Sequence, residues 1–432
     1  MPTDKPPASL DRYEHEEFVV TLPYASAVCH RTRTEFGVAC EVTNSPKLNL
    51  SLVRPQRLAE SAGAIRQAVL TRLADRDRTW VLDIVPAPTE PGRSPLNDLM
   101  FCLRFDFAAE YGGWSPSMGK NRVVENVTGL PHADGGSVGE PEPAPALAPA
   151  SSANLHRGTG VRVGIVDTRL FPHPRLAGSY LAAHSDLLPA PTDLLPARPA
   201  YSRFAGHATF VAGRVLRQAP AAELDIRRTL NDQHARTTLW DLVHRMVSFR
   251  DSGVQILNLS LGCYTSDGQP PMVLARAVQL LAPDIVVVAA AGNHGDANDN
   301  VQAGHPDLKP TTPFWPAALD DVLAVGADLG PTDPTRSAPF SPRLPWVTFT
   351  AEGSGVVSTY LDGKVEIPSK NGPQLVQFDG YARWSGTSFA AATVTGELAA
   401  LIRPGTSAWE AVAELKERTE QDPSGPVRLF AG

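Results

Sequence analysis

The chain has 432 residues, of which 42% are hydrophobic and 20% are charged, and its formal net charge is −7. This composition is typical of a folded globular protein and excludes a largely disordered chain. The acidic balance also argues against a general nucleic-acid binder, which needs a basic face.

The N-terminus and the cysteines bear on the cellular compartment. The first residues, MPTDKPPASLDRYEHEEF, are polar and lack the apolar centre of a secretory signal, and no run of about 18 apolar residues predicts a membrane span. The four cysteines match no zinc spacing: Cys29, Cys40, Cys102 and Cys263. We therefore expect buried free thiols in a reducing compartment, and a cytoplasmic protein. A disulfide between Cys29 and Cys40 is the alternative.

Residues 1–134 are predicted to form a small α+β domain. The runs at 17–22, 80–85 and 99–107 are rich in Val, Leu and Phe, which is typical of strands. The run at 57–75 has its apolar residues at helical spacing. Nothing in this part of the sequence looks catalytic.

Residues 135–156 are predicted to be a linker. Pro and Ala dominate the stretch GGSVGEPEPAPALAPASSA, and large apolar residues are almost absent from it. Such a composition favours a semi-extended connection between domains. Residues 157–432 then form the larger domain.

In the larger domain, runs typical of strands alternate with runs typical of helices. Strands are expected at 161–167, 222–230, 254–262 and 285–293, and helices at 207–216, 238–251 and 271–283. Continuous apolar strands between amphipathic helices predict an α/β fold with a parallel sheet covered on both faces. In such sheets, functional groups gather beyond the carboxyl ends of the strands.

Four polar residues lie at the boundaries of these expected elements. Asp167 closes the first strand, Asn293 closes the run 285–293, His207 opens a helix, and Ser388 opens a small-residue helix within WSGTSFAAATVTG. A serine hydroxyl needs a base to take its proton during attack, and imidazole suits that task near neutral pH. A carboxylate orients the imidazole, and an amide donor binds the oxyanion. Together the four residues indicate acyl-transfer chemistry.

The segments that carry these residues also have a characteristic order. They are GVRVGIVDTRLFPHPRL (160–176), GHATFVAG (206–213), ILNLSLG (256–262) with VVVAAAGNHG (286–295), and SGTSFAAATVTG (385–396). Over roughly residues 157–420 the chain therefore resembles the subtilisin family of serine proteases. The resemblance implies that Ser388 is the nucleophile and His207 the general base, with Asp167 orienting His207 and Asn293 in the oxyanion hole.

The resemblance also implies a substrate site. An extended substrate backbone would pair with Ser260, Leu261 and Gly262. The pocket for the residue before the scissile bond would be lined by Ala290, Ala291 and Gly292. The implied substrate is a peptide or protein, with no cofactor required and with neither nucleic acid nor membrane as a partner. The sequence does not indicate the oligomeric state.

Four residues depart from the family's usual pattern. Arg169 and Ala208 stand where the family usually has Gly, Phe210 stands where it usually has His, and Ala392 stands where it usually has Pro. Ala208 would be strained if its backbone needed a positive φ. Arg169 places a cation near Asp167, and we expect this side chain to point to solvent.

The remaining histidines and one acidic loop raise the question of a metal. His173, His294 and His305 lie near the motif loops but lack ligand spacing, so packed or solvated side chains are expected. The loop at 296–300 is rich in oxygen ligands but lacks a recognised calcium pattern. We expect no metal-ligating residues. A structural calcium ion, common in the family, is the alternative.

The sequence thus predicts a cytoplasmic, subtilisin-like serine endopeptidase with a fused N-terminal α+β domain. Two alternatives remain open: a peptide-maturation enzyme or macrocyclase of the same fold, and an inactive peptide-binding scaffold. We expect the N-terminal domain to stay attached, because it has enough apolar sequence for its own core. Its removal as a pro-segment is the competing interpretation.

Overall fold

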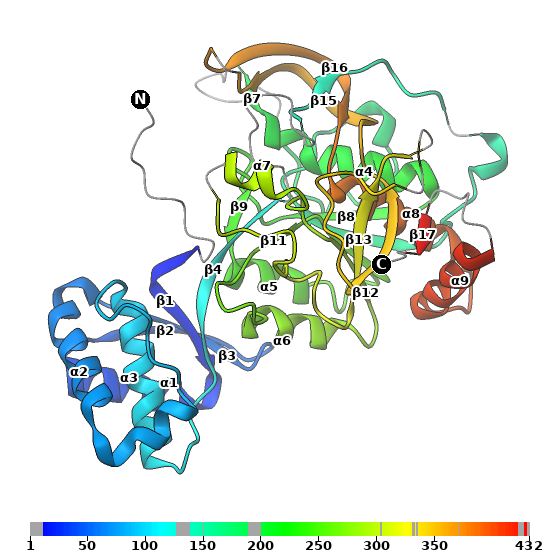
Figure 1. The fold of residues 1–432 in the computed structure, drawn as a ribbon. Coiled ribbons are helices and arrows are strands. Elements are labelled where there is room, and N and C mark those ends of the chain that lie inside the picture. Colours follow the sequence, from blue (N-terminus) through cyan, green and yellow to red (C-terminus); the bar gives the residue numbers. More distant parts are fainter. Residues whose placement is uncertain are drawn as a thin grey trace.

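The structure is a computed structural model of the chain. It describes residues 12–126, 139–149, 151–188, 200–302, 305–330, 333, 336–369, 371–421 and 427–429. Figure 1 shows a small N-terminal domain, at the lower left, beside a larger α/β domain.

The N-terminal domain is an antiparallel sheet with helices on one face (Figure 1). Its strands lie in the order β4-β1-β3-β2 and are β1 (Tyr13–Thr21), β2 (Cys40–Ser45), β3 (Leu50–Pro55) and β4 (Met118–Asn126). Its helices are α1 (Ala25–Phe36), α2 (Ala62–Ala74) and α3 (Pro95–Glu110). Side chains of the helices pack on strand residues such as Phe18 and Val20 to form a core of their own.

The predictions for this domain are partly confirmed. β1 and α2 coincide with the strand predicted at 17–22 and the helix predicted at 57–75. The strands predicted at 80–85 and 99–107 are wrong, because the chain there forms a 3-10 helix (Arg76–Asp83) and α3. α3 is buried on most sides, so it lacks the polar stripe by which a helix is recognised.

The larger domain is built on a sheet with the order β17-β14-β13-β12-β10-β6-β8. Its strands are β6 (Arg162–Asp167), β8 (Glu223–Arg228), β10 (Ile256–Leu259), β12 (Val286–Ala290), β13 (Val322–Asp328), β14 (Val347–Glu352) and β17 (Val427–Leu429). Neighbouring strands pair in parallel, except that β17 pairs antiparallel with β14. The predicted parallel sheet is confirmed.

Helices cover both faces of this sheet, also as predicted. One face carries α4 (His207–Gln218) and α8 (Thr387–Leu401), and α9 (Ala408–Gln421) packs against α8. The other face carries α5 (Leu239–Val247) and α6 (Met272–Leu281). The strands are apolar on both sides because successive residues enter opposite cores, as Ile165 and Val166 do.

Small residues allow α8 to pass close to α4. Ala390, Ala391 and Ala392 are fully buried. A Cβ built on Gly396 would lie 2.5 Å from the carbonyl oxygen of Val215 in α4, so this approach requires glycine. Helix packing therefore explains the run of small residues that follows Ser388 in the sequence.

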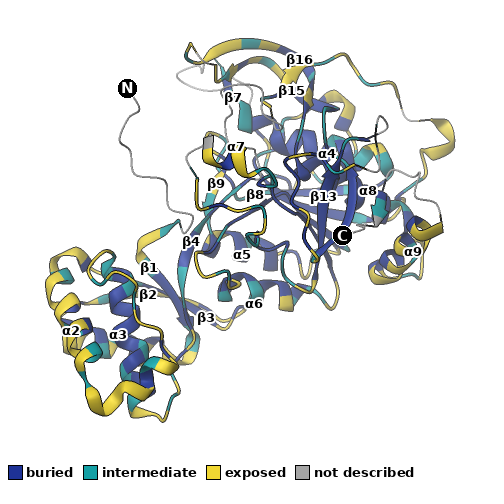
Figure 2. Cartoon of the chain, in the orientation of Figure 1, coloured by how far each residue is buried: buried dark blue, intermediate teal, exposed yellow. Residues whose placement is uncertain are grey.

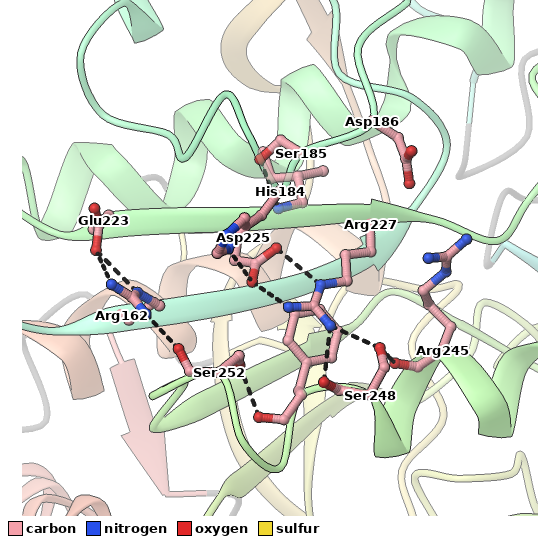
Figure 3. A network of polar contacts seen from close by, with 12 residues as sticks. Arg162, His184, Ser185, Asp186, Glu223, Asp225, Arg227, Arg245, Ser248 and Ser252 are labelled. Carbon is pink, nitrogen blue, oxygen red and sulfur yellow. Dashed lines mark hydrogen bonds and ion pairs between the residues drawn. The ribbon is translucent and has the colours of Figure 1, made fainter.

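The edge strand β8 is covered by the segment 179–186 and by a polar network (Figure 3). The backbone N–H of Asp186 donates to the carbonyl oxygen of Ile226 at 2.9 Å. The fully buried carboxylate of Asp225 accepts from Arg227 Nε at 3.0 Å and from Arg227 Nη2 at 2.6 Å. These contacts leave little of the edge open to pairing with another chain.

A hairpin of β15 (Val356–Ile367) and β16 (Gln374–Trp384) extends above the sheet in Figure 1. The short strand β7 (Tyr201–Ser202) pairs with β15, and β5 (Glu142–Pro143) pairs with β16. β5 lies within the predicted linker, so this part of the linker belongs to a sheet.

Other contacts also hold residues 139–149 on the larger domain. Arg203 forms an ion pair with Glu140 at 2.7 Å, and Trp384 Nε1 donates to the carbonyl oxygen of Gly139 at 2.9 Å. Segment 139–149 thus differs from the free linker expected at 135–156. Its proline-rich composition is equally compatible with an edge strand, where proline is tolerated.

The second face of the N-terminal sheet packs on α5 and α6. Val19, Leu50 and Leu52 from this face are buried in the same apolar cluster as Leu242 and Leu274 of those helices. Figure 2 shows the buried strands at this contact and the exposed outer surface of α2. The two domains therefore share a core across their interface.

Candidate active site

Asp167 and His207 form a buried hydrogen-bonded pair. Asp167 is the last residue of β6, and His207 is the first residue of α4. His207 Nδ1 lies 2.9 and 2.8 Å from the two carboxylate oxygens of Asp167. Both side chains are 0% exposed. The carboxylate fixes the proton on Nδ1 and leaves Nε2 as the atom that can exchange protons.

Two aromatic rings place His207 beside the turn that carries Ser388. The centroid of the His207 ring lies 5.7 Å from those of Trp384 and Phe389, which come before and after this turn. His207 Nε2 is buried and makes no hydrogen bond to any described residue, so a bond from Ser388 is not formed here. Catalytic hydrogen bonds of this kind often tighten only when substrate is bound.

Ser388 is presented by a glycine turn at the start of α8. Gly386, which precedes the helix, has φ 155° and ψ 151°, a conformation that favours glycine. Ser388 Oγ lies 3.5 Å from the carbonyl oxygen of Ser260, and Ser260 Oγ donates to the carbonyl oxygen of Ser388 at 3.2 Å. The hydroxyl of Ser388 therefore lies at the start of the predicted substrate edge.

Asn293 is tied to the same turn. Its Oδ1 accepts from the backbone N–H of Thr387 at 2.9 Å and from the Thr387 hydroxyl at 3.0 Å. A Cβ built on Gly386 would lie 3.4 Å from Asn293 Nδ2, so the amide nitrogen also lies beside the turn. From this place it can donate to an oxyanion that forms next to Ser388.

The predicted pocket wall lies at the end of β12. Ala290, Ala291 and Gly292 are all buried, and the N–H of Ala291 donates to the carbonyl oxygen of Val325 at 2.9 Å. Gly292 has φ 101°, and a Cβ there would lie 2.6 Å from His294 Nδ1. Glycine is therefore required immediately before Asn293.

His294 holds this loop through both of its ring nitrogens. Nε2 lies 2.8 Å from the carbonyl oxygen of Thr312 and therefore carries the proton, whereas Nδ1 accepts from the hydroxyl of Tyr264 at 3.1 Å. Burial lowers the pKa of His294 to about 4, against the opposing effect of the hydrogen bond to Thr312. The packed histidine expected from the sequence is found, but its partner Tyr264 carried no signal in the sequence.

The structure also bears on the departures from the family pattern. Ala208 lies inside α4 and does not have a positive φ, so it is not strained. Arg169 is partly exposed, and its guanidinium lies 3.7 Å from Asp232, so it does not simply point to solvent. His173 is buried, and its Nδ1 accepts from the N–H of Arg175 at 3.0 Å.

The oxygen-rich loop is used to cap α7 (Ala297–Gln302). Asp296 Oδ1 accepts from the N–H groups of Asn298 and Asp299 at 2.8 and 3.2 Å. His305, expected to be packed or solvated, is half-buried, and its N–H donates to the carbonyl oxygen of Asn300 at 2.9 Å. Within the part of the chain that the structure describes, no group of three His, Cys, Asp or Glu residues could hold a metal.

The predicted substrate edge is occupied by β4 of the N-terminal domain (Figure 1). β4 lies between two short strands of the larger domain, β11 (Leu261–Gly262) and β9 (Arg236–Thr238). It is antiparallel to both of them. An extended segment of the chain thus runs where the sequence predicts that substrate would pair.

The register shows which way this segment points. Glu125 pairs with Gly262, and Asn126 pairs with Leu261. The N–H of Asn126 also donates to the carbonyl oxygen of Ala235 at 3.1 Å, just before β9. Since the two strands are antiparallel, the C-terminal end of β4 leads toward Ser260, the neighbour of Ser388.

Comparison with known proteins decides the family. The model described as "Subtilase family" (Peptidase_S8) matches residues 158–425. The chain belongs to the subtilase family. The resemblance found in the sequence is thereby confirmed.

Two curated relatives and one solved structure illustrate the similarity. The "Thermophilic serine proteinase" of Bacillus sp. (strain AK1) is 30% identical over 283 residues, which cover 63% of this subtilase and 59% of that protein. The "Intracellular serine protease" of Paenibacillus polymyxa is 27% identical over 268 residues, covering 60% and 71%. Fervidolysin from Fervidobacterium pennivorans, a keratinolytic enzyme related to subtilisin, matches with a TM-score of 0.58 at 17% identity.

These matches have limits of coverage. The fervidolysin match covers 96% of this subtilase and 60% of that chain, and at its level of identity it shows the fold alone. This subtilase spans about three fifths of the length of the Bacillus relative and of fervidolysin. Among the described helices, none is long and apolar enough to cross a membrane.

Proposed function

We propose that this subtilase is a serine endopeptidase that hydrolyses peptide bonds through an acyl-enzyme on Ser388. The observation that carries the proposal is the buried Asp167–His207 pair, which lies beside the turn that carries Ser388. The same turn is hydrogen-bonded to Asn293. A hydroxyl, an imidazole, a carboxylate and an amide donor are the groups that acyl transfer needs.

Each group has a defined role in the proposed reaction. His207 Nε2 takes the proton of Ser388 as Oγ attacks the carbonyl carbon, and Asn293 Nδ2 donates to the oxyanion that forms. Asp167 stabilises the imidazolium. Collapse then breaks the C–N bond, and the leaving amine takes the proton from His207. Water attacks the acyl-enzyme by the same route and releases the carboxylic acid and the free hydroxyl.

The N-terminal domain would restrain this site, because β4 fills the edge along which a substrate would pair. This placement supports the competing interpretation, in which the domain is cut off or displaced before peptides enter. The expectation that the domain stays attached remains a prediction, and the masses of the intact chain and its fragments test it.

Labelling and peptide cleavage test the proposal together. A fluorophosphonate should label wild-type protein on Ser388 and leave Ser388→Ala unlabelled, and Ser388→Ala or His207→Ala should lose most peptidase activity. Product masses from a peptide library separate hydrolysis, which adds water, from macrocyclisation, which does not. An inactive scaffold would bind peptides without labelling or cleavage. Near-full turnover by Ser388→Ala, with contaminating proteases excluded, would refute the assignment.

We also propose that the protein acts in the cytoplasm on peptides or proteins. The four cysteines are free, so the alternative disulfide is not formed: Cys29, Cys40, Cys102 and Cys263. Free thiols are typical of reducing compartments. One relative is named an intracellular serine protease. Cell fractionation followed by detection of the protein tests this location.

A further inference from the structure

The register of β4 defines the positions that a bound peptide would take. Ser388 Oγ touches the carbonyl oxygen of Ser260, so the peptide residue paired with Ser260 supplies the carbonyl that Ser388 attacks. In the same antiparallel register, the residue paired with Gly262 comes two residues earlier. Glu125 takes that place in this structure. It therefore marks the third residue before a scissile bond.

A cation of the larger domain contacts the side chain at this place. Arg236 Nε donates to Glu125 Oε2 at 3.0 Å. Arg236 is the first residue of β9, which flanks β4, so it would also flank any peptide bound in the same way. The second cation on Glu125 is Arg12, at 3.0 Å, which belongs to the N-terminal domain and would leave with it.

Arg236 is held in position by its own domain. Its carbonyl oxygen accepts from the backbone N–H of Asn231 at 3.0 Å and from Asn231 Nδ2 at 2.8 Å. Ala235, which precedes it, has φ 50° and donates its N–H to the carbonyl oxygen of Asn231 at 2.9 Å. These bonds close the loop within the larger domain, in addition to the bond that Ala235 accepts from Asn126 of β4. The backbone of Arg236 would therefore stay at the edge when β4 leaves.

Acidic groups near Arg236 do not neutralise it. Asp232, on the same loop, lies 3.7 Å from Arg169 and 3.6 Å from Arg228. In the described ranges, the ion pair that Arg236 makes is the one with Glu125. Removal of β4 therefore leaves a cation that lacks its carboxylate partner.

We propose that Arg236 selects peptide substrates with an acidic residue at the third position before the scissile bond. The inference rests on the proposed peptidase function and names a preference of the same site. Glu125 is then a built-in example of the residue that this site accepts. The Arg236 and Glu125 side chains are 50% and 38% exposed, so the preference is expected to be several-fold rather than absolute.

The test is competition between matched peptides in one reaction. The peptides carry the sequence of residues 119–132, with Glu, Gln or Lys at the position of Glu125, and mass spectrometry follows their loss. The enzyme is the full chain, incubated first until its mass is constant. Wild type is expected to consume the Glu peptide about fivefold faster than the Gln peptide, and the Lys peptide slowest.

Variants assign the preference to one side chain. Arg236→Gln is expected to bring the Glu-to-Gln ratio close to one, and Arg236→Glu is expected to favour the Lys peptide. Arg250→Glu makes the same change in charge on an exposed residue beyond the far end of α5 and should keep the wild-type ratio. Fluorophosphonate labelling of Ser388 in each variant checks that the site is assembled.

The possible failures are distinguishable. Equal consumption of all three peptides by wild type, or an unchanged ratio in Arg236→Gln, overturns the role of Arg236 and leaves the peptidase function standing. Absence of cleavage together with absence of labelling on Ser388, in wild type and also in Val124→Asp, which weakens the docking of β4, overturns the peptidase function, and the selectivity falls with it.

Discussion

Among the proposed active-site residues, Asn293 is the one whose contribution to the rate can be measured most directly. Its Oδ1 accepts from Thr387, and its Nδ2 lies beside Gly386 in the same turn, next to the place of the proposed oxyanion. We predict that Asn293→Ala lowers kcat by about 10²–10³ with little change in KM, because the donor acts on charge present only in the transition state. Steady-state kinetics on a cleaved peptide measures both constants.

The outcome can also contradict the assignment. An unchanged kcat in Asn293→Ala, with acylation as the slow step, would mean that the amide does not face the oxyanion. Asn298→Ala is a matched control, because this exposed residue lies on α7 of the same loop region. It should keep the wild-type kcat.

His294 is expected to make the fold sensitive to acid. Its pKa lies near 4 when folded, against 6.5 for the unperturbed group. Between these values the unfolded chain binds more protons than the folded chain, so stability falls as the pH drops from about 6.5 to about 4. Below pH 4 this group contributes no further change. The loss amounts to about 3 kcal/mol.

The measurement compares variants in a Ser388→Ala background, which prevents self-digestion. Urea unfolding between pH 7.5 and 4 should show a weaker acid dependence in His294→Gln than in the parent. His156→Gln, an exposed histidine, serves as the control and should leave the dependence unchanged. Equal slopes in the parent and His294→Gln would contradict the prediction.

Some features of the candidate site could be predicted from the sequence, and others could not. The positions of Asp167 and His207 follow from where a strand ends and a helix begins, and the structure joins them by a hydrogen bond. The supports of Asn293 could not be predicted, because Tyr264 and Thr312 come from separate loops and meet only at the His294 ring. Nor does a pattern in the sequence indicate that Arg236 would face Glu125.

At the scale of elements, the buried pair on β8 is expected to be costly to break (Figure 3). Arg227→Met would leave the 0% exposed carboxylate of Asp225 without the cation that neutralises it. We predict a loss of about 3–5 kcal/mol in the free energy of unfolding. The double variant Asp225→Asn with Arg227→Met should recover part of this loss, because it removes the buried charge.

A more exposed ion pair near the same edge strand, β8, serves as the comparison for the cost of breaking the buried pair. Arg162 pairs with Glu223 at 2.8 Å, but their side chains are 31% and 44% exposed. Arg162→Met should therefore cost much less, about 1 kcal/mol. Urea unfolding in the Ser388→Ala background measures all three variants. A loss in Arg227→Met no larger than that in Arg162→Met would contradict the argument from burial.

Two kinds of element could be predicted from the sequence: helices with one apolar and one polar face, and strands that are apolar on both faces. β6, β10 and β12 read as continuous apolar runs because each is buried on both sides of the sheet. The same reasoning fails for α3, since a helix buried on most sides also gives a continuous apolar run. Strand pairing such as that of β5 with β16 depends on residues far apart in sequence and left no local signal.

At the scale of the whole molecule, the N-terminal domain has two cores that serve different purposes. Phe18 and Val20 pack under its own helices, whereas Val19 and Val124 are buried in the cluster formed with α5 and α6. Successive side chains of a strand point to opposite faces of the sheet. One set of side chains therefore forms the domain's own core, and the other set forms its contact with the larger domain. The sequence indicated a domain with a core of its own, but not that its last strand would lie beside β11.

This separation allows docking to be weakened without unfolding the domain. Val124→Asp places a carboxylate in the apolar contact with the larger domain, and a buried charge without a partner costs several kcal/mol. We predict that Ser388 in the full chain then reacts with a fluorophosphonate at least about tenfold faster than in wild type, because β4 leaves the substrate edge. Labelling is timed by intact mass, so that only uncut chains are counted.

Leu70→Asp is the matched control, because Leu70 is an exposed residue of α2 on the outer surface of the same domain. It should label at the wild-type rate. The same mass spectra test the expectation that the domain stays attached. A fragment cut between Asn126 and Gly139 that forms in wild type but not in Ser388→Ala, with labelling rising as it forms, would overturn that expectation. Segment 139–149 would stay on the larger domain through its contacts with Arg203 and Trp384. Equal labelling of intact wild type and Val124→Asp would mean that β4 does not restrain the site.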